Sequence, residues 1–353
     1  MSPAADDGAM RTLPRVLTRI LEGDRLGEGE AADLLKTMAN DDVHPAVAGA
    51  LLAALRLRGE TAAELRGFAV ALRRLARRPD LPSGLPALDI VGTGGDGSGS
   101  LNLSTGAALL AAAAGVPVVK HGNRSLSSRC GSADVLEALG LRLPLDERAA
   151  GRCLAACGFT FLDARHYHPA VAALGPVRRA LGVRTALNLA GPLANPAAPP
   201  YAVIGACTPA AAATLAEALA GLPVERAFVI HGDPGWDEPT PIGPFLQFEV
   251  RPGRVESTER DPADAGFARC LPDDLRGGDP GENARRLRAA LEGEPGPHRD
   301  ALVLGAALGL EVAGRAPSLA AGRAIAEAAI AGGAAKGLVD RLAAFGRKEL
   351  ARG

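Results

Sequence analysis

A glycine-rich segment between two short apolar runs most restricts what this chain can fold into. The segment reads VGTGGDGSGSLNLST over Val91–Thr105 and follows the apolar run LDIV at 88–91. An alanine-rich stretch comes next, and then a second apolar run, VPVVK, at 116–120. Strand, glycine loop, helix and strand form a βαβ unit, which places two parallel strands in one sheet. The sequence therefore predicts an α/β fold with a helix over 104–114.

Later apolar stretches continue this pattern of strands. They are FTFL at 159–162, YAVIGA at 201–206, RAFVIHG at 226–232 and FLQFEV at 245–250. Helical patterns lie between or after them, and PAAAATLAEALAGL is the clearest. We therefore expect a mainly parallel central sheet. Residues 251–300 are polar and rich in proline and glycine and predict no definite element, whereas the alanine-rich stretch 300–349 predicts helix.

The chain before the glycine loop predicts helices alone. The segment TAAELRGFAVALRRLA begins with Thr61 and Glu64, which have the spacing of a capping box. Its apolar residues recur at helical spacing, and they are Leu65, Phe68, Leu72 and Leu75. Similar patterns occur near 12–22, 28–39 and 46–58. A link rich in proline and glycine, RPDLPSGLPALD, then indicates a boundary. We predict a helical domain over 1–80 and an α/β domain over 86–353.

Charge and apolar content exclude several classes of protein. The 353 residues include 39 basic and 40 acidic side chains, and a net charge of −1 disfavours general binding to nucleic acid or membrane. The longest apolar run, 107–119, falls short of the roughly 20 residues that span a bilayer. The first residues, MSPAADDGAM, are acidic, so we expect no signal peptide. The five cysteines include no CxxC pair and favour reduced thiols in a cytoplasmic protein.

The string GTGGDG satisfies the G-x-G-x-x-G pattern of dinucleotide-binding proteins, but its surroundings do not. That pattern requires a helix directly after the glycines, whereas Ser98–Asn102 intervene. It also needs an acidic residue about 20 positions further on, where this chain has Lys120. A P-loop would need Gly-Lys-Ser/Thr, and a flexible linker would not need polar residues such as Asp96 and Ser104. Free backbone N–H groups beside a helix N-terminus favour a diphosphate cradle instead.

Further motifs follow in order: NLST, KHGNRSLSSRCGSADVLEALG, HPAVAALGPVRRALGVRT, NLAGPLANP and HGDPGWDEPTPIG. With GTGGD they span about 92–244, and jointly they resemble the anthranilate phosphoribosyltransferase family. The resemblance implies transfer of the phosphoribosyl group of 5-phosphoribosyl 1-pyrophosphate to anthranilate in tryptophan biosynthesis, with release of pyrophosphate. It implies a small helical domain, joined by helices around 166–188, and a larger α/β domain of the nucleoside phosphorylase/phosphoribosyltransferase type. Family members are usually homodimers.

The resemblance also assigns substrate-binding roles residue by residue. The loop that holds the diphosphate matches Gly92, Gly95 and Asp96, extended by Ser100, Asn102, Leu103, Ser104 and Thr105. Lys120 matches a lysine beside the phosphates. The part toward the ribose 5-phosphate end matches His121, Gly122, Asn123, Arg124, Ser125, Leu126, Ser127, Ser128 and Ser132. Asn123 also matches an anthranilate contact, together with His168 and with Arg178, which is expected to face the carboxylate.

The metal assignment is implied in the same way. Asp237 and Glu238 match paired magnesium carboxylates, and Ser104 matches a further ligand, with two Mg²⁺ ions per site. The chemistry agrees, because the pyrophosphate leaving group gathers negative charge that metal and amide donors stabilise. Mg²⁺ usually takes one or two carboxylates plus substrate phosphates. The neutral amine of anthranilate is already nucleophilic, so we name no catalytic base.

Two other functions stay open at this point. A pyrimidine nucleoside phosphorylase-like enzyme of the same fold would use phosphate and would not need the pair Asp237 and Glu238. A non-catalytic relative that binds nucleic acid would need a basic face. Alone, His121 or His168 would more often be an ordinary buried histidine, and the acidic pair would more often be solvated surface. The ordered set of motifs favours the transferase over each of these.

Overall fold

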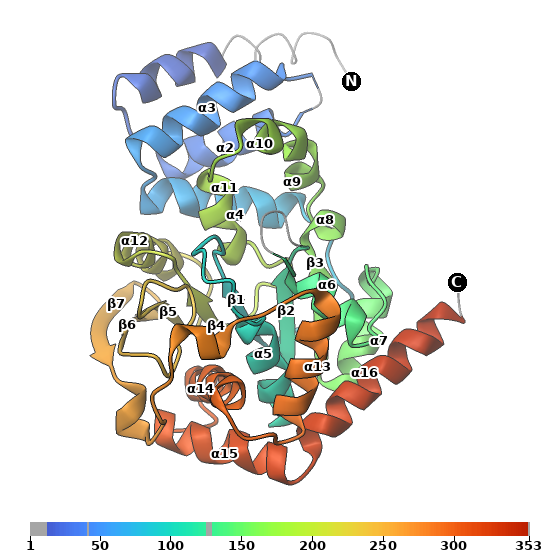
Figure 1. The fold of residues 1–353 in the computed structure, drawn as a ribbon. Helices are drawn as coiled ribbons and strands as arrows, with labels where there is room; N and C mark the ends of the chain where they lie inside the picture. Colours follow the sequence, from blue (N-terminus) through green and yellow to red (C-terminus); the bar gives the residue numbers. More distant parts are fainter. Residues whose placement is uncertain (1–12, 41, 125–128, 352–353) are drawn as a thin grey trace.

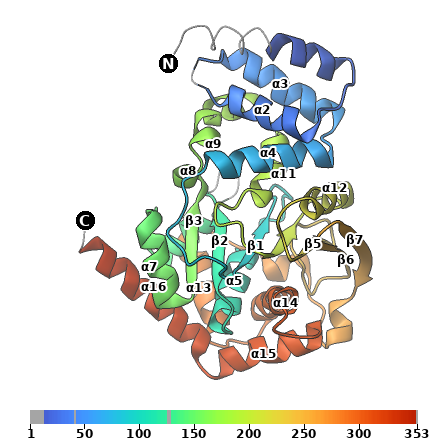
Figure 2. The same cartoon turned by 180° about the vertical axis from the view of Figure 1, so that it is seen from behind.

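The computed structural model describes residues 13–40, 42–124 and 129–351. A helical part lies above a larger α/β part, as Figures 1 and 2 show from opposite sides. The sheet has seven strands in the order β3-β2-β1-β4-β5-β6-β7. They are β1 Leu88–Gly92, β2 Val118–Gly122, β3 Phe159–Asp163, β4 Tyr201–Gly205, β5 Arg226–Gly232, β6 Phe245–Arg251 and β7 Arg254–Arg260. The first five strands are parallel, whereas β6 and β7 are antiparallel. This confirms the predicted α/β class with a mainly parallel sheet.

Helices cover both faces of the sheet. Alternate residues of β4 belong to different apolar clusters, with Val203 on one side and Ala202 and Ile204 on the other. The α/β part contains α5 Leu103–Ala113, α6 Ser132–Ala138, α7 Glu147–Cys157, α12 Pro209–Ala220, α13 Pro280–Leu291, α14 Pro297–Val312, α15 Leu319–Ala331 and α16 Ala334–Leu350. Within the described residues, none of the helices has the length and apolar character that crossing a bilayer takes.

Residues 251–300 contain structure that the sequence pattern did not indicate. They hold β7, the short 3₁₀ helices η2 Pro262–Ala265 and η3 Pro272–Leu275, and α13. Strand β7 is mostly exposed, because it pairs only with β6 at the edge of the sheet. An exposed, charged edge strand carries no apolar alternation, which explains why its residues did not predict a strand.

The helical part combines two distant segments of the chain. The N-terminal segment supplies a helix over 13–21 together with α2 Glu28–Met38, α3 Pro45–Arg58 and α4 Ala62–Leu75. The middle of the chain supplies α8 Ala164–Tyr167, α9 Pro169–Ala173, α10 Gly175–Leu181 and α11 Ala186–Ala190. Apolar residues of both segments, including Leu51 and Leu187, share one buried cluster. The division into domains at 80–86 itself stays a prediction.

Helix α4 connects the helical part to the sheet. Its predicted capping box is present, with Thr61 Oγ1 accepting from the Glu64 N–H at 3.2 Å and Glu64 Oε2 accepting from the Thr61 N–H at 2.9 Å. Phe68 packs in the helical cluster, whereas Leu65 packs with residues of α12 and β4. Leu75, which has the same helical spacing, is 37% exposed in the last turn of the helix.

Candidate active site

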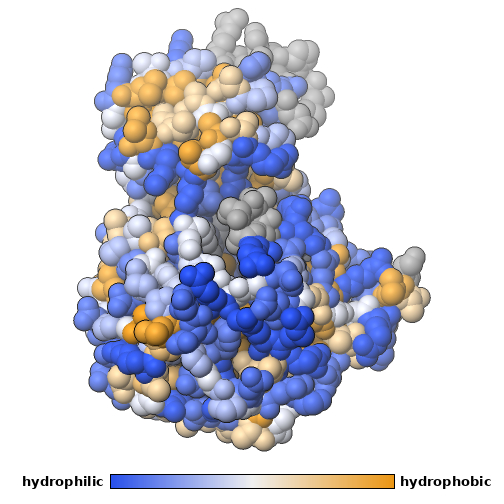
Figure 3. All heavy atoms as spheres, in the orientation of Figure 1, coloured by the Kyte–Doolittle hydropathy of each residue, from blue (hydrophilic) through white to orange (hydrophobic). Residues whose placement is uncertain are grey.

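The glycine loop connects the end of β1 to the start of α5 at the carboxyl edge of the sheet. Open α/β sheets bind ligands at this edge, because the loops after parallel strands gather there. Figure 3 shows that the molecular surface is hollowed between the helical and the α/β part. Gly94, Gly95, Gly97 and Gly99 all have positive φ, between 61° and 74°. Side chains rarely tolerate this conformation, so the geometry of the loop itself requires glycine.

The acidic pair lies directly on the glycine loop. Asp237 Oδ2 accepts a hydrogen bond from the backbone N–H of Gly94, and Glu238 Oε1 accepts one from the N–H of Ser104 at 3.1 Å. The partners are 143 and 134 residues apart in sequence. The structure therefore brings the predicted metal carboxylates onto the predicted diphosphate cradle. It also shows that these two cradle amides already have acceptors within the chain.

Two glycines that the sequence motifs did not single out make this approach possible. A Cβ on Gly205, at the end of β4, would overlap the backbone carbonyl of Asp237. A Cβ on Gly232, at the end of β5, would overlap the carbonyl of Glu238. A glycine closing each apolar run, as in YAVIG and RAFVIHG, was the available signal. The acidic segment thus crosses the sheet edge in direct contact with two strand ends.

The carboxylates crowd one another. Asp96 Oδ2 lies 3.4 Å from the backbone nitrogen of Asp237 and accepts its hydrogen bond. Burial, followed by the charge of Asp96, raises the pKa of Asp237 to about 7. Burial, followed by the charge of Asp237, raises the pKa of Glu238 to about 8. A cation held between these groups would relieve the repulsion, because an opposite charge favours the ionised form.

The donor set tests whether magnesium fits here. In the described ranges, no three His, Cys, Asp or Glu side chains form a group that could hold a metal ion by themselves. Mg²⁺ usually takes only one or two carboxylates, and substrate phosphates supply further ligands. The pair Asp237 and Glu238 beside a phosphate cradle has that composition. The residues therefore fit magnesium that arrives with a phosphorylated substrate.

Lys120 lies behind the start of α5. It is 1% exposed, and its Nζ donates to Ser104 Oγ at 3.3 Å and to the carbonyl of Ile90. Burial lowers the pKa of Lys120, whereas the nearby carboxylate of Asp89 opposes this shift. Thr105 is fully buried, and its hydroxyl has no hydrogen-bond partner among the described residues. This side of the cradle thus combines a buried cation with an unpaired polar group.

Asn195, a buried polar residue to which the sequence analysis gave no role, contacts strands β1 and β2 behind the site. Asn195 Nδ2 donates to Asp89 Oδ2 at 2.9 Å and to the carbonyl of Val119 at 2.8 Å. Asn195 belongs to the motif NLAGPLANP, to which the sequence pattern assigned no role. Burial raises the pKa of Asp89 to about 6. The hydrogen bond from Asn195 to the Asp89 carboxylate connects β1 to the segment that follows α11.

The predicted anthranilate side lies beneath the helical part. The rings of His121 and His168 are 5.0 Å apart at their centroids and meet edge to face. Burial lowers the pKa of His121 well below its usual range and that of His168 to about 4, so both rings are neutral at pH 7. Arg178 donates to Asn188 Oδ1 at 3.4 Å. The described residues show no hydrogen bond from Arg178 to the glycine loop or to either histidine.

The predicted ribose 5-phosphate end is only partly described. Asn123 Oδ1 accepts from the N–H of Arg124 at 2.8 Å. The guanidinium of Arg124 forms a bidentate ion pair with Glu137 of α6, and so it is held by that helix. Ser132 begins α6, next to Gly122. The predictions for Ser125, Leu126, Ser127 and Ser128 lie outside the described residues.

Arg184 is a site residue to which the sequence motifs gave no role in the loop. Its guanidinium donates to the carbonyls of Thr93 at 3.3 Å and Gly95 at 3.4 Å, and to Cys207 Sγ at 2.8 Å. The residue lies between α10 and α11, which pack in the helical part. Arg184 therefore connects the helical part to the carbonyl side of the glycine loop. Its position in the GVRT string was the signal available in the sequence.

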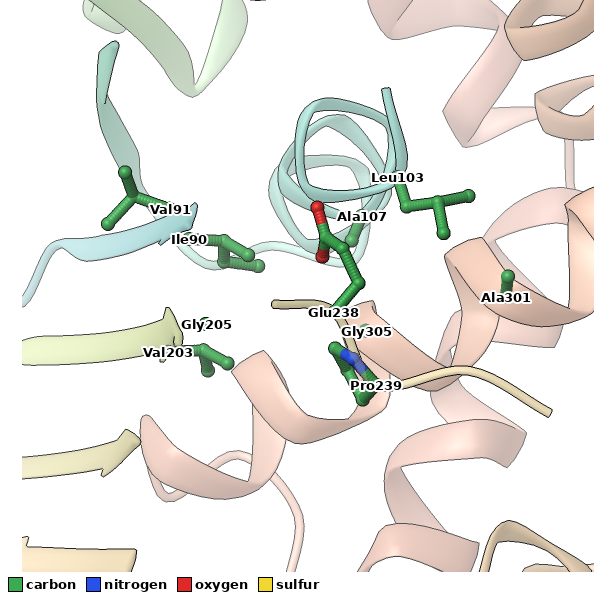
Figure 4. A pocket seen from close by; sticks show the side chains of 10 residues that line it. All are labelled: Ile90, Val91, Leu103, Ala107, Val203, Gly205, Glu238, Pro239, Ala301 and Gly305. Atoms are coloured by element: carbon green, nitrogen blue, oxygen red, sulfur yellow. The ribbon is translucent and has the colours of Figure 1, made fainter. Parts of the chain in front are cut away.

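A small cavity lies behind Glu238. Figure 4 shows its lining, in which the Glu238 carboxylate points toward α5 between mostly apolar side chains. Its volume is about 10 Å³, at the lower limit of what one water molecule needs. It is therefore a packing gap around the Glu238 side chain and does not hold a substrate.

The chain matches two family models. It matches the glycosyl transferase family, a/b domain, over residues 84–336 and the glycosyl transferase family, helical bundle domain, over residues 14–76. A curated relative, an anthranilate phosphoribosyltransferase from Rubrobacter xylanophilus, is 45% identical over 342 residues. The alignment covers 97% of this chain and 99% of the relative.

Solved structures agree with this match. The crystal structure of an anthranilate phosphoribosyltransferase from Thermus thermophilus has a TM-score of 0.88 and 44% identity, and covers 94% of this chain and 99% of that chain. An anthranilate phosphoribosyltransferase from Saccharomyces cerevisiae, in complex with phosphoribosyl pyrophosphate (PRPP) and Mg, has a TM-score of 0.87 at 25% identity. It covers 96% of this chain and 98% of that chain.

Proposed function

The chain belongs to the anthranilate phosphoribosyltransferase family, and we propose on that premise that its glycine loop and acidic pair bind the substrate that this family consumes. The enzyme transfers the phosphoribosyl group of PRPP to the amine of anthranilate, giving N-(5-phosphoribosyl)anthranilate and pyrophosphate. The bond from the anomeric carbon to pyrophosphate breaks, the amine nitrogen bonds to that carbon, and the nitrogen loses a proton. One observation carries the site assignment: Asp237 and Glu238 hydrogen-bond to the backbone of Gly94 and Ser104.

The residues of the loop provide for a diphosphate. The first N–H groups of a helix of this length, together with its dipole, favour an anion at the N-terminus of α5. Lys120 lies next to Ser104 and adds a positive charge beneath the same turn. Gly94 and Gly95 have positive φ values, which favour glycine. Because glycine has no side chain, the path of the substrate to the backbone stays open at these two positions. These groups orient the diphosphate and oppose the negative charge that builds up on it as it leaves.

We assign magnesium to Asp237, Glu238 and Ser104. The yeast relative is described in complex with PRPP and Mg, and the oxygen ligands here suit that ion. When bound, magnesium neutralises charge on the leaving pyrophosphate. Two ions per site are proposed as the resemblance of the motif around Asp237 and Glu238 implies.

The alternative functions are less well supported. A pyrimidine nucleoside phosphorylase-like enzyme would have no use for two carboxylates held against its phosphate loop. A nucleic-acid-binding relative would need a basic face, and the net charge of the chain is −1. The curated relatives at 43–46% identity carry the name of the transferase.

The decisive experiment follows the fluorescence of anthranilate. We expect the purified protein to consume it only when PRPP and Mg²⁺ are both present. Turnover of a pyrimidine nucleoside with inorganic phosphate, without anthranilate, would contradict the transferase and favour the phosphorylase.

Replacing Arg178 by Ala should damage anthranilate use selectively. Its guanidinium is partly buried, burial lowers its pKa, and its hydrogen bond to Asn188 is long at 3.4 Å, so it remains available to a carboxylate. A charge-assisted hydrogen bond contributes about 1.5–3 kcal/mol, so kcat/KM for anthranilate should fall about 10- to 100-fold. The matched control is Arg179→Ala, at the exposed neighbouring position on α10.

The KM for PRPP should change little in either variant. If Arg178→Ala raised only the KM for PRPP, or if Arg179→Ala had the larger effect on anthranilate, the placement of Arg178 on the anthranilate side would be wrong. Steady-state kinetics with each substrate varied in turn separates these results.

We also propose that two copies of the chain associate through the helical part, in the cytoplasm. Leu21 and Leu57 there are 66% and 87% exposed, and Figure 3 shows an apolar patch on this part. Large apolar patches usually mark an interface. Light scattering should give about twice the 35.8 kDa of one chain, and Leu57→Glu should shift the mass toward one chain. The cytoplasmic location rests on the five cysteines, which include no CxxC pair and favour reduced thiols.

A further inference from the structure

A strap formed by residues 275–278 holds the outer half of the glycine loop. Ser100 and Arg276 form an isolated antiparallel bridge. The N–H of Leu101 donates to the carbonyl of Leu275, and the N–H of Gly277 donates to the carbonyl of Gly99, both at 2.9 Å. The strap leads directly into α13, whose N-cap is Asp279. The glycine loop is therefore supported from a part of the chain for which the sequence pattern predicted no structure.

A relay of two side-chain amides continues from the strap into the site. Asn283, in the first turns of α13, is 1% exposed. Its Oδ1 accepts from the N–H of Gly278 at 2.6 Å, and its Nδ2 donates to Asn102 Oδ1 at 2.9 Å. Asn102 Nδ2 in turn donates to the carbonyl of Cys130 at 3.1 Å.

Backbone groups at both ends determine how the two amides are oriented. The N–H of Gly278 can only donate, and the carbonyl of Cys130 can only accept. The Asn283 oxygen must therefore face Gly278, and the Asn102 oxygen must face Asn283. A flip of either amide would place two donors or two acceptors against each other.

The relay has a consequence for α5. Asn102 is the N-cap residue of this helix, yet its side chain makes no capping hydrogen bond within the described part of the chain. An N-cap asparagine normally accepts from a backbone N–H of the first turn. Here the oxygen is committed to Asn283. It therefore does not compete for those first-turn N–H groups that Glu238 and Leu101 do not already engage, and these groups stay available to the diphosphate of the proposed function.

We propose that Asn283 is a positioning residue for PRPP binding, acting through Asn102. It turns the Asn102 oxygen away from the first turn of α5 and ties the glycine loop to Cys130, just after the segment proposed for the ribose 5-phosphate end. The proposal rests on the proposed function, because it assumes that the first turn of α5 binds PRPP. Asn283 itself need not touch the substrate.

A double-mutant cycle tests the proposal. Asn283→Ala should raise the KM and the dissociation constant for PRPP about tenfold, the loss expected for one well-placed hydrogen bond, with little change in the KM for anthranilate. In an Asn102→Ala background, adding Asn283→Ala should cause no further rise. Independent effects that multiply would overturn the idea that Asn283 acts through Asn102.

Two further variants separate positioning from loss of stability. Asn283→Asp keeps the acceptor for Gly278 but removes the donor to Asn102, so it should raise the KM for PRPP as Ala does while losing less stability. Gln247→Ala is the matched control. Gln247 lies on β6, is also buried, at 3% exposure, and its Oε1 accepts a hydrogen bond from the Arg260 guanidinium at 3.0 Å. It should lower the melting temperature and leave the KM for PRPP unchanged.

The outcomes distinguish this proposal from the proposed function. PRPP binding is measured by calorimetry with Mg²⁺ as well as by turnover. A wild type that binds PRPP but does not consume anthranilate would overturn the proposed reaction, and calorimetry on the variants would still decide the relay. A wild type that binds no PRPP would overturn both. The third outcome is that the wild type is active but the Asn283 variants bind PRPP as tightly as Gln247→Ala does. This result would overturn the positioning role of Asn283 and leave the proposed function intact.

Discussion

Replacing Asp237 by Asn and Glu238 by Gln together should remove most turnover and much of its dependence on magnesium. The loss should be on the order of 10²–10³-fold, because a metal ion supplies several kcal/mol of charge stabilisation to the transition state. The amide oxygens can still accept from Gly94 and Ser104, which bond to the carboxylates in the native chain. Burial raises the pKa values of both acids, and so does a nearby like charge, from Asp96 for Asp237 and from Asp237 for Glu238. Their ionised forms therefore do not stabilise the fold without metal. The melting temperature without ligands should therefore hardly fall.

Reaction rate against Mg²⁺ concentration decides this prediction. Asp233→Asn is the matched control, because Asp233 is an exposed carboxylate in the same loop. It should give a wild-type curve. A wild-type curve from the Asp237 and Glu238 double variant would show that the metal is held elsewhere, and the site assignment would have to be withdrawn.

Replacing Gly95 by Val should abolish PRPP binding, with a loss of affinity of more than about a hundredfold. Gly95 has a φ of +73°, where a β-branched residue is strained by about 1–3 kcal/mol. A Cβ here would also lie 3.1 Å from the Arg184 guanidinium that holds the loop carbonyls. We therefore expect the strained backbone and the disturbed Arg184 contacts to move the loop out of the position in which its N–H groups can reach a diphosphate.

The control for this variant is Gly253→Val. Gly253 has a similar φ of +68° in the hairpin between β6 and β7, and a Cβ there would meet no described atom within 4 Å. It should lose similar stability and bind PRPP normally. Calorimetry and thermal melting of both variants give the comparison. Unchanged PRPP affinity in a folded Gly95→Val protein would refute the cradle.

Much of the fold was predictable because its signals are local. The capping box of Thr61 and Glu64 predicted the start of α4 at the residue where the structure begins it. The predicted helix over 104–114 is observed as Leu103–Ala113. Period and turn chemistry depend only on neighbouring residues. Strand β7 was missed because it gives no such local signal. It is an exposed edge strand, so no buried face produces an alternating pattern in its sequence.

The candidate site was predictable only in part. The motifs named the groups that could bind a diphosphate and magnesium, but not their contacts. Arg124 was expected to face the substrate, whereas its guanidinium is bound to Glu137. Its substrate role stays a prediction. The contacts of Arg184 and Asn283 with the loop were missed. Arg184 contacts a backbone carbonyl of the loop, and Asn283 contacts the side chain of Asn102. Contacts of this kind between distant residues produce no recognisable spacing in the sequence.

The sequence by itself determined the local conformations, the order of the motifs and the chemistry available to them. Glycines set the turns of the loop, and carboxylates, lysine and amides set what it can bind. Only the tertiary structure decided which of these groups meet. Strand β4 lies beside β1, and β5 lies beside β4. This order brings Asp237 and Glu238, which follow β5, into contact with the glycine loop, which lies more than a hundred residues earlier in the sequence. The physical reason is that sheet order depends on how all the apolar faces are buried together, which no short segment encodes.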